Sequence, residues 1–446
     1  MILTKYKLGE ILDVTRGASL SGEYYATEGE YIRLTCGNFD YQNNCFKENK
    51  SKDNLYYVGD FKSEFLMEEG DIITPLTEQA IGLLGSTAII PESGKYIQSQ
   101  DVAKIICKED LLDKDFAFYL ISSALVKQQL SAAAQQTKIR HTSPDKIKDC
   151  TVWIPELSEQ KRIGKLLRSI DRKIELNRAI NQNLEAMAKQ LYDYWFVQFD
   201  FPNENGRPYK SFGGKMVWNE KQRKYIPEYW EVKSLSNWLE IKSGFPFKSE
   251  TYKPIGRYKI ITIKNVQDGE LVTSGCDYVN DIPSRAKDYI SLQIGDRLIS
   301  LTGNCGRLCV VCEENLLLNQ RVGLLCCDAI YLEYFYNFLN SGTMRTVIDN
   351  LANGAAQANL SPVELCKTDC FIPPIDILLS YNRKVNAIRK AIVQNNQEIS
   401  QLAKQRDELL PLLMNGQVSV NSDYPTVEFN FLVQCREYFA NSLLIT

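Results

Sequence analysis

The chain has 446 residues, of which 44% are hydrophobic and 24% charged, a balance that is ordinary for globular proteins of two or three domains. No apolar run is long enough to cross a bilayer, and the N-terminus lacks a signal pattern, so we expect a cytoplasmic location and 13 reduced cysteines. The formal charge of −3 excludes a strongly basic protein, although a local basic face for nucleic acid is compatible with it.

Residues 1–156 are predicted to form a β-rich module of mixed α/β type. Short apolar runs bounded by turns indicate core strands at Ile72–Ile73, Ala88–Ile90 and Val102–Ile106. A helix is predicted over Phe116–Leu130. The module ends with a polar loop around Lys138–His141, a Ser143-Pro144 pair and the Ile154-Pro155 pair that precedes the next segment.

A long amphipathic helix is predicted over residues 157–200, and a second one over residues 375–420. In both, the apolar residues recur in steps of three and four and fall on one stripe, as in a coiled-coil seam. A single stripe of this kind needs a partner in water, so we expect the two helices to pair. The predicted seam consists of Ile163, Leu167, Ile170, Ile174, Leu184, Met187 and Leu191 in the first helix and Val385, Ile388, Ile392 and Leu402 in the second.

The region between the helices contains an internal repeat of the first module. Residues 201–225, rich in Asn, Gly, Lys and Pro, are predicted to be a linker, and residues 226–374 to be the second module. Gly70–Thr77 parallels Gly295–Thr302, and the order of six such landmarks is preserved. Strands are predicted at Leu308–Val311 and Val322–Leu325 and a helix at Tyr331–Leu339, whereas residues 421–446 receive no role.

No set of residues indicates catalysis or a metal site. There is no phosphate-binding loop and no methyltransferase motif, and the one histidine, His141, has no nucleophile or carboxylate pair beside it. We interpret it as a polar loop residue, with a DNA-backbone contact as the alternative. Cys305, Cys309 and Cys312 have the spacing of an iron–sulfur motif, but Cys309 falls in a predicted strand, so we expect structural thiols rather than a cluster or zinc.

Several short sequences are typical of one protein family, and with the order module, helix, module, helix they cover nearly the whole chain. They are Glu159–Ile163 after Ile154-Pro155, Trp195–Val197, Asn205–Lys210, Ile226–Val232 and Leu410–Gly416. The chain therefore resembles the specificity subunit of Type I restriction–modification systems from Tyr6 to about Val420. Only the tail beyond Val420 departs from the family pattern.

The resemblance implies an α+β fold of two tandem target-recognition domains separated by two long antiparallel coiled-coil-like helices, with internal pseudo-two-fold symmetry. Each domain would read one half of a bipartite double-stranded DNA target, and the helices would set the gap between the halves. It also implies two methyltransferase subunits that carry S-adenosylmethionine and restriction subunits that use ATP and Mg²⁺. The chain itself would be non-catalytic and would bind no cofactor or metal.

Polar side chains on the turns between strands are the candidates for DNA contacts. Arg, Lys, Asn and Gln match the donors and acceptors of base edges, while Lys, Arg, Ser and Thr hold phosphates. Equivalent turns of the two modules supply Arg16, Ser19, Thr77, Gln79, Lys138 and Arg140 in the first, and Lys248, Thr302, Asn304, Arg307, Gln357 and Asn359 in the second.

Two other functions are compatible with the sequence. A non-catalytic protein-binding scaffold with duplicated β-rich modules would suit the acidic composition better, and an enzyme built on the three cysteines is the second alternative. For the helices, a purely structural role competes with docking of a partner subunit. In a third interpretation, the first helix holds phosphates through its basic residues Arg162, Lys165, Arg168 and Arg172.

Overall fold

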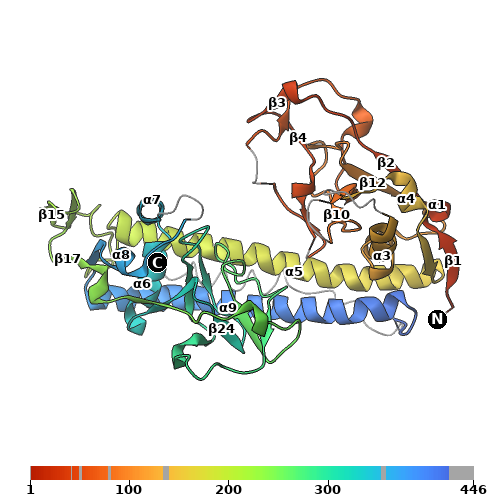
Figure 1. Cartoon of the computed structure of the whole chain (residues 1–446). Coiled ribbons are helices and arrows are strands. Elements are labelled where there is room, and N and C mark those ends of the chain that lie inside the picture. Colours follow the sequence, from red (N-terminus) through yellow and green to blue (C-terminus); the bar gives the residue numbers. More distant parts are fainter. Residues whose placement is uncertain are drawn as a thin grey trace. The chain divides into compact units, whose positions relative to one another are not determined.

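The computed structural model describes residues 2–41, 43–49, 53–78, 82–133, 140–352 and 358–420. The chain divides into two compact units, and neither consists of a module alone. The first unit contains the described parts of Met1–Ile170 and Lys404–Thr446, and the second contains Asp171–Ala403. Each unit therefore combines one module with a segment of both long helices (Figure 1).

The first module is built on two four-stranded sheets. One has the order β10-β8-β12-β2, with bounds Ala88–Ile89, Ile72–Pro75, Val102–Cys107 and Leu12–Arg16. The other has the order β11-β4-β7-β3, with bounds Tyr96–Ile97, Tyr31–Arg33, Tyr56–Tyr57 and Tyr25–Ala26. Shorter pairs join β1 (Thr4–Lys7) to β14 (Thr151–Ile154), β5 (Phe39–Asp40) to β6 (Cys45–Phe46), and β9 (Thr77–Glu78) to β13 (Arg140–His141). The three predicted core strands are thus confirmed.

The second module repeats this topology. Its first sheet has the order β18-β25-β22-β23, with bounds Glu240–Ser243, Val322–Cys326, Arg297–Ser300 and Leu308–Val310. Its second sheet has the order β20-β19-β24-β21, with bounds Tyr278–Val279, Tyr258–Ile261, Leu316–Leu318 and Ser291–Leu292. The pair β17 (Glu231–Ser234) and β26 (Asp369–Ile372) corresponds to β1 and β14, because both pairs join the start of a module to its end.

Side-chain details repeat as well. Asn38 and Asn265 each accept a hydrogen bond from the backbone N–H of the threonine three residues earlier, at 2.9 and 2.8 Å. Gly17 and Gly244 occupy equivalent close approaches, where an added Cβ would lie 2.2 Å from the carbonyl oxygen of Gln98 or Leu318. Only glycine fits there, since a backbone atom cannot move aside as a side chain can. The repeat therefore extends from topology to individual turns.

Helices cover the sheets at matching places. In the first module they are α1 (Leu8–Ile11), α2 (Lys114–Ile121), α3 (Ala124–Ala133) and α4 (Pro144–Lys148), and in the second α6 (Ala329–Leu339), α7 (Gly342–Leu351) and α8 (Pro362–Cys366). The single helix predicted over Phe116–Leu130 was wrong, because two helices meet at Ser122-Ser123. The hydroxyl of Ser122 donates to the carbonyl oxygen of Phe118 at the end of α2, a local bond that competes with helix continuation.

The segment predicted as a linker, residues 201–225, is largely ordered structure. Its end forms a hairpin of β15 (Met216–Asn219) and β16 (Lys224–Pro227), and Phe201 and Tyr209 are buried in the core of the second unit. The rings of Phe201 and Tyr209 stack at 4.7 Å between centroids. Its Asn, Gly and Pro content therefore marks turns around this aromatic core rather than a flexible connection.

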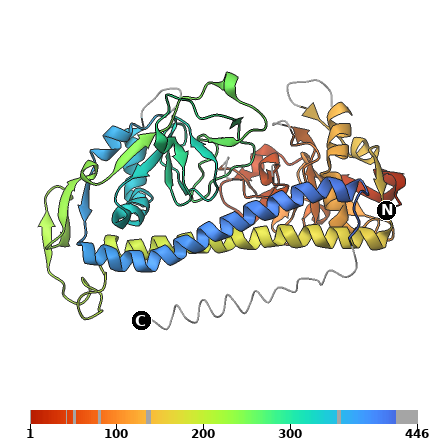
Figure 2. The same ribbon diagram turned by 90° about the horizontal axis from the view of Figure 1, so that it is seen from below.

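The long helices are α5 (Leu157–Tyr192), which ends in a π-helical turn over Asp193–Val197, and α9 (Ile375–Met414). In the first unit, Ile163 and Leu167 of α5 share a core with Leu413 and Met414 of α9. In the second unit, Figure 2 shows the sheets of the module against one side of both helices. No helix within the described ranges is both long and apolar enough to span a membrane.

Candidate nucleic-acid interface and the helix pair

A polar recess opens in the second module where β22 ends. The chain turns through Gly303 and Gly306, both with positive φ, before β23 begins. The side chain of Thr302 donates to Asn359 Oδ1 at 3.0 Å, and this bond holds the turn against the loop that precedes α8. The recess has a volume of about 270 Å³, and its polar and charged lining consists of Asp268, Asn304, Cys305, Arg307, Arg345 and Asp349. We call it the arginine recess.

Asp268 orients both arginines of this recess. Arg345 Nη2 donates to Asp268 Oδ1 and, at 3.2 Å, to Asn340 Oδ1. Arg307 Nε lies 3.8 Å from Asp268 Oδ2, and its Nη1 donates to Gln267 Oε1 at 2.6 Å. The lining contains two arginines and two aspartates, so its net charge is close to zero. Such a mixture of donors and acceptors suits the edges of bases better than phosphate groups, which favour net positive charge.

In the first module, β9 pairs with β13, which places Arg140 opposite Glu78 and His141 opposite Thr77. Arg140 Nη1 donates to Ser131 Oγ at 3.0 Å and lies 3.6 Å from Glu78 Oε2. Arg16 is exposed at the end of β2, where its Nε donates to the carbonyl oxygen of Gln100 at 2.8 Å. Carboxylate and carbonyl groups therefore orient the arginines in this module as well.

The other candidate side chains divide into three groups. Thr77 and Thr302 are buried, and their hydroxyls bond within the module, to Asp101 and Asn359 respectively, so their position suits support of the turns. Ser19, Lys248, Asn304 and Asn359 are exposed. Gln79, Lys138 and Gln357 lie outside the described residues.

Sequence reasoning missed Asp268, Arg345 and Asp349. Asp268 lies in the segment between β19 and β20, and Arg345 and Asp349 lie on α7. Only the tertiary fold therefore brings these residues close to Arg307. The Gln267–Glu270 turn contains Asp-Gly, which signals a turn but not its neighbours in space.

The cysteine triplet does not form one surface. Cys309 and Cys312 are buried, while Cys305 lies at the arginine recess. Burial raises the pKa of the Cys312 thiol to about 11, so the thiolate form that binds metals is disfavoured at neutral pH. Over the described part of the chain, no three His, Cys, Asp or Glu side chains are grouped as metal ligands. His141 is exposed on β13, opposite Thr77.

The helix pair, α5 and α9, is antiparallel, and its contacts in the second unit are largely polar. Asn177 bonds to Glu398 at 2.8 Å, and Asn181 bonds to Asn396 at 2.7 Å and to Asn395 at 2.9 Å. The residue numbers of the α9 partners fall as those of the α5 residues rise, so the two helices run in opposite directions. Glu398 also pairs with Lys173.

The residues of the predicted seam differ in their burial. Ile163, Leu167, Ile174, Val385 and Ile392 are buried, and Ile170, Leu184, Leu191, Ile388 and Leu402 are half-buried. Met187 is 39% exposed, and the fully buried residue beside it is Ala188. Part of the apolar stripe also packs into a module core, since Val385 belongs to the core of the second unit and Leu191 and Ile388 pack against it.

The fold and these surfaces define a duplicated recognition protein, with two equivalent modules attached to one helix pair. Residues 3–186 match the Type I restriction modification DNA specificity domain. The chain is 25% identical over 332 residues to the MjaIX specificity subunit of Methanocaldococcus jannaschii, covering 72% of this chain and 73% of that one. It is 23% identical over 375 residues to the HindI specificity subunit of Haemophilus influenzae, covering 72% and 81%.

The fold is also similar to the crystal structure of a Type I restriction–modification S subunit from M. genitalium. The TM-score is 0.55 at 16% identity, and the match covers 93% of this chain and 96% of that one. Residues 3–186 therefore carry a type I restriction–modification specificity domain, and most of the chain is similar in sequence and fold to specificity subunits.

Proposed function

We propose that the chain is the DNA sequence-recognition subunit of a type I restriction–modification complex, and that each module reads one half of a bipartite target. The observation that carries the proposal is the duplication. Both modules contain oriented arginines beside a four-stranded sheet of the same order: Arg140 on β13 in the first module, and Arg307 at the turn between β22 and β23 in the second. Two equivalent recognition modules in one chain match a DNA target that consists of two separated half-sites.

In each module, the oriented arginines are the proposed base-reading groups. A guanidinium held in one plane can donate two parallel hydrogen bonds to the O6 and N7 atoms of guanine. Arg307 and Arg345 would act in this way in the second module, and Arg16 and Arg140 in the first. The remaining predicted contacts, to bases or to phosphates, are Ser19, Thr77, Gln79, Lys138, Lys248, Thr302, Asn304, Gln357 and Asn359.

The helix pair is proposed to set the distance between the two half-sites. The 36 residues of α5 rise by about 54 Å along the helix axis, more than one DNA turn of about 34 Å. The outward charged faces of α5 and α9 would dock two methyltransferase subunits, through which restriction subunits join. Methylation with S-adenosylmethionine and cleavage with ATP and Mg²⁺ would belong to these partners in the cytoplasm, while this chain binds no cofactor and catalyses no step.

The test is reconstitution with the methyltransferase subunits, followed by methylation of genomic DNA and long-read detection of the modified bases. The expected result is one split motif with a fixed gap. Binding to a duplex that carries this motif should weaken steeply with salt, because neutralised phosphates release counterions. A complex that methylates no split motif, or binding that is insensitive to salt, would instead favour the protein-binding scaffold.

A further inference from the structure

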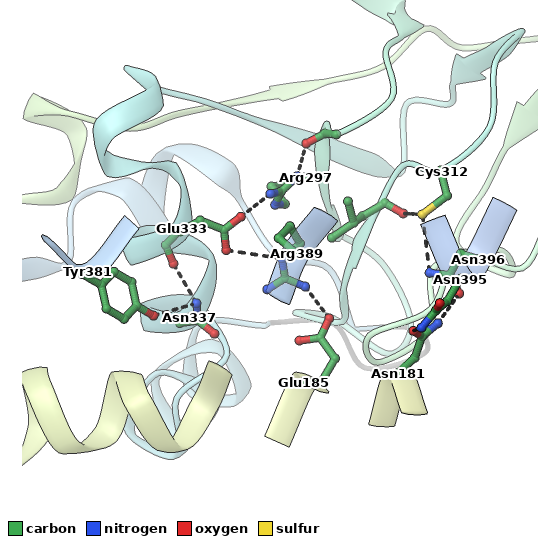
Figure 3. A network of polar contacts seen from close by, with 12 residues as sticks. Asn181, Glu185, Arg297, Cys312, Glu333, Asn337, Tyr381, Arg389, Asn395 and Asn396 are labelled. Carbon is green, nitrogen blue, oxygen red and sulfur yellow. Dashed lines mark hydrogen bonds and ion pairs between the residues drawn. The ribbon is translucent and has the colours of Figure 1, made fainter. Parts of the chain in front are cut away.

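A chain of four alternating charges joins the second module to both long helices (Figure 3). Arg297 on β22 pairs with Glu333 on α6, and Glu333 Oε2 lies 3.3 Å from Arg389 Nε on α9. Arg389 Nη1 in turn pairs with Glu185 on α5. One continuous ionic network therefore crosses from the sheet of the module, through a module helix, to both members of the helix pair.

Three of the four members of the network are buried, and Glu185 is half-buried. Arg297, Glu333 and Arg389 are 5%, 3% and 4% exposed, and both guanidinium groups lie over the ring of Tyr336, at 5.7 and 4.5 Å from its centroid. Burial alone would raise the pKa of Glu333, but Arg389 and Arg297 outweigh it and lower the pKa. The carboxylate is therefore charged at neutral pH, and the network is ionic rather than neutral.

Such a network is a poor way to gain stability. Removing charges from water is costly, and well-packed apolar residues of similar volume often do as well or better. Here the compensation is also incomplete, because Arg297 Nε and Arg389 Nη2 have no hydrogen-bond partner within the described part of the chain. In some proteins, buried polar groups of this kind contribute instead to a unique arrangement, because any other arrangement leaves charges unpaired.

The first module has only part of this arrangement. Ile72 follows Gly70-Asp71 as Arg297 follows Gly295-Asp296, so an apolar residue stands at the place of Arg297. Ser123 and Ser341 each accept a hydrogen bond from the backbone of the helix that follows, and this shared junction places Asp115 at the position of Glu333. Asp115 lies 3.8 Å from Arg168 of α5. The first module therefore has an ion pair to its long helix where the second has a network of four charges.

We propose that the Arg297–Glu333–Arg389–Glu185 network is a positioning element that holds the second module on the helix pair in one orientation and so restricts the complex to one spacing between half-sites. This inference rests on the proposed function. Adding one base pair to the spacer moves a half-site by about 3.4 Å and rotates it by about 35°. A module whose orientation is not fixed can follow such a displacement, whereas a fixed module cannot.

The experiment compares methylation by the reconstituted complex on duplexes whose spacer is native, one base pair longer or one base pair shorter. The variant combines Arg297→Met, Glu333→Leu, Arg389→Met and Glu185→Leu, so that no buried charge is left unpaired. We expect an unchanged or higher Tm, unchanged half-site bases, and about a tenfold loss of discrimination between spacers. A folded variant that discriminates as well as the wild type would overturn the proposal.

The matched control is Lys173→Met with Glu398→Met, which removes an ion pair between the same helices that includes no module residue. It should keep the wild-type spacing, and equal relaxation by this control would also count against the network. If the fourfold variant does not fold, Glu333→Gln takes its place, with the same criterion applied to the folded protein. A wild-type complex that methylates no split motif would refute the proposed function itself, which is a separate result.

Discussion

Asp268→Asn tests whether the arginine recess reads bases. The change keeps the shape of the side chain but removes the charge that orients Arg307 and Arg345. The side chain of Asp268 is 60% exposed, and exposed ion pairs contribute only about 0.2–1 kcal/mol each because water screens them. With two such pairs, we expect the free energy of unfolding to change by less than about 2 kcal/mol, so that the protein stays folded and effects on DNA binding are not effects on folding.

The substitution should strengthen non-specific DNA binding but weaken discrimination between DNA sequences. Loss of one negative charge should strengthen non-specific binding and make the salt dependence steeper by about 0.9 in the log–log slope. An arginine that is no longer oriented loses a base contact worth about 1–3 kcal/mol, so discrimination at the second half-site should fall by about 5- to 150-fold. The first half-site should be read as before.

The assay is equilibrium binding of the reconstituted complex, by fluorescence anisotropy, to duplexes with the cognate or a scrambled second half-site at several salt concentrations. Asp281→Asn is the control, because Asp281 is exposed and does not line the recess. It makes the same change in net charge. If Asp268→Asn strengthened cognate and scrambled binding by the same factor, Asp268 would only repel phosphates, and the arginines would not read bases.

Three further predictions concern the second unit. Phe196→Ala should lower the free energy of unfolding by about 3–5 kcal/mol in urea titrations, because its ring lies 4.8 and 4.9 Å from those of Tyr381 and Tyr334; a loss below 1 kcal/mol would contradict this packing. Burial and then the charge of Lys210 lower the pKa of Lys224 from 10.5 to about 8, so the unfolded chain binds this proton more tightly. Stability should then rise between about pH 8 and 10.5, and Lys224→Met should remove that rise. Gly244→Ala should prevent folding of the second module, as measured by proteolysis, whereas Gly342→Ala, with open space around it, should not.

The repeat was predictable because its landmarks are set by local chemistry. Gly70 and Gly295 both adopt positive φ just before a strand, and Ser143 and Ser361 each cap a short helix that begins with proline. Such positions demand particular residue types, so they survive in the sequence where the rest of the modules differ. The places of several strands along the chain followed from these turns.

The sites were less predictable because they depend on tertiary contacts. A stripe of apolar residues shows that a helix has a buried side but not what covers it, and here Met187 is exposed while Asn181 faces the second helix. Likewise, nothing in the local sequence of Arg345 indicates that Asp268, far away in the chain, accepts its hydrogen bond. Turn residues such as Arg307 could be selected by type, but their orienting partners could not.

The division of both long helices between the units has a consequence for biosynthesis. Ile163 and Leu167 share their core with Leu413 and Met414, and the backbone N–H of Val420 donates to Glu159. A ribosome must therefore translate all of Asp171–Ala403 before the first unit can be completed, a delay of roughly 12–47 s at about 5–20 residues per second. During that time the apolar side of the nascent α5 has no α9 to cover it, which makes it a binding site for chaperones. For the same reason, nonsense mutations near the 3′ end of the reading frame should damage the N-terminal unit first.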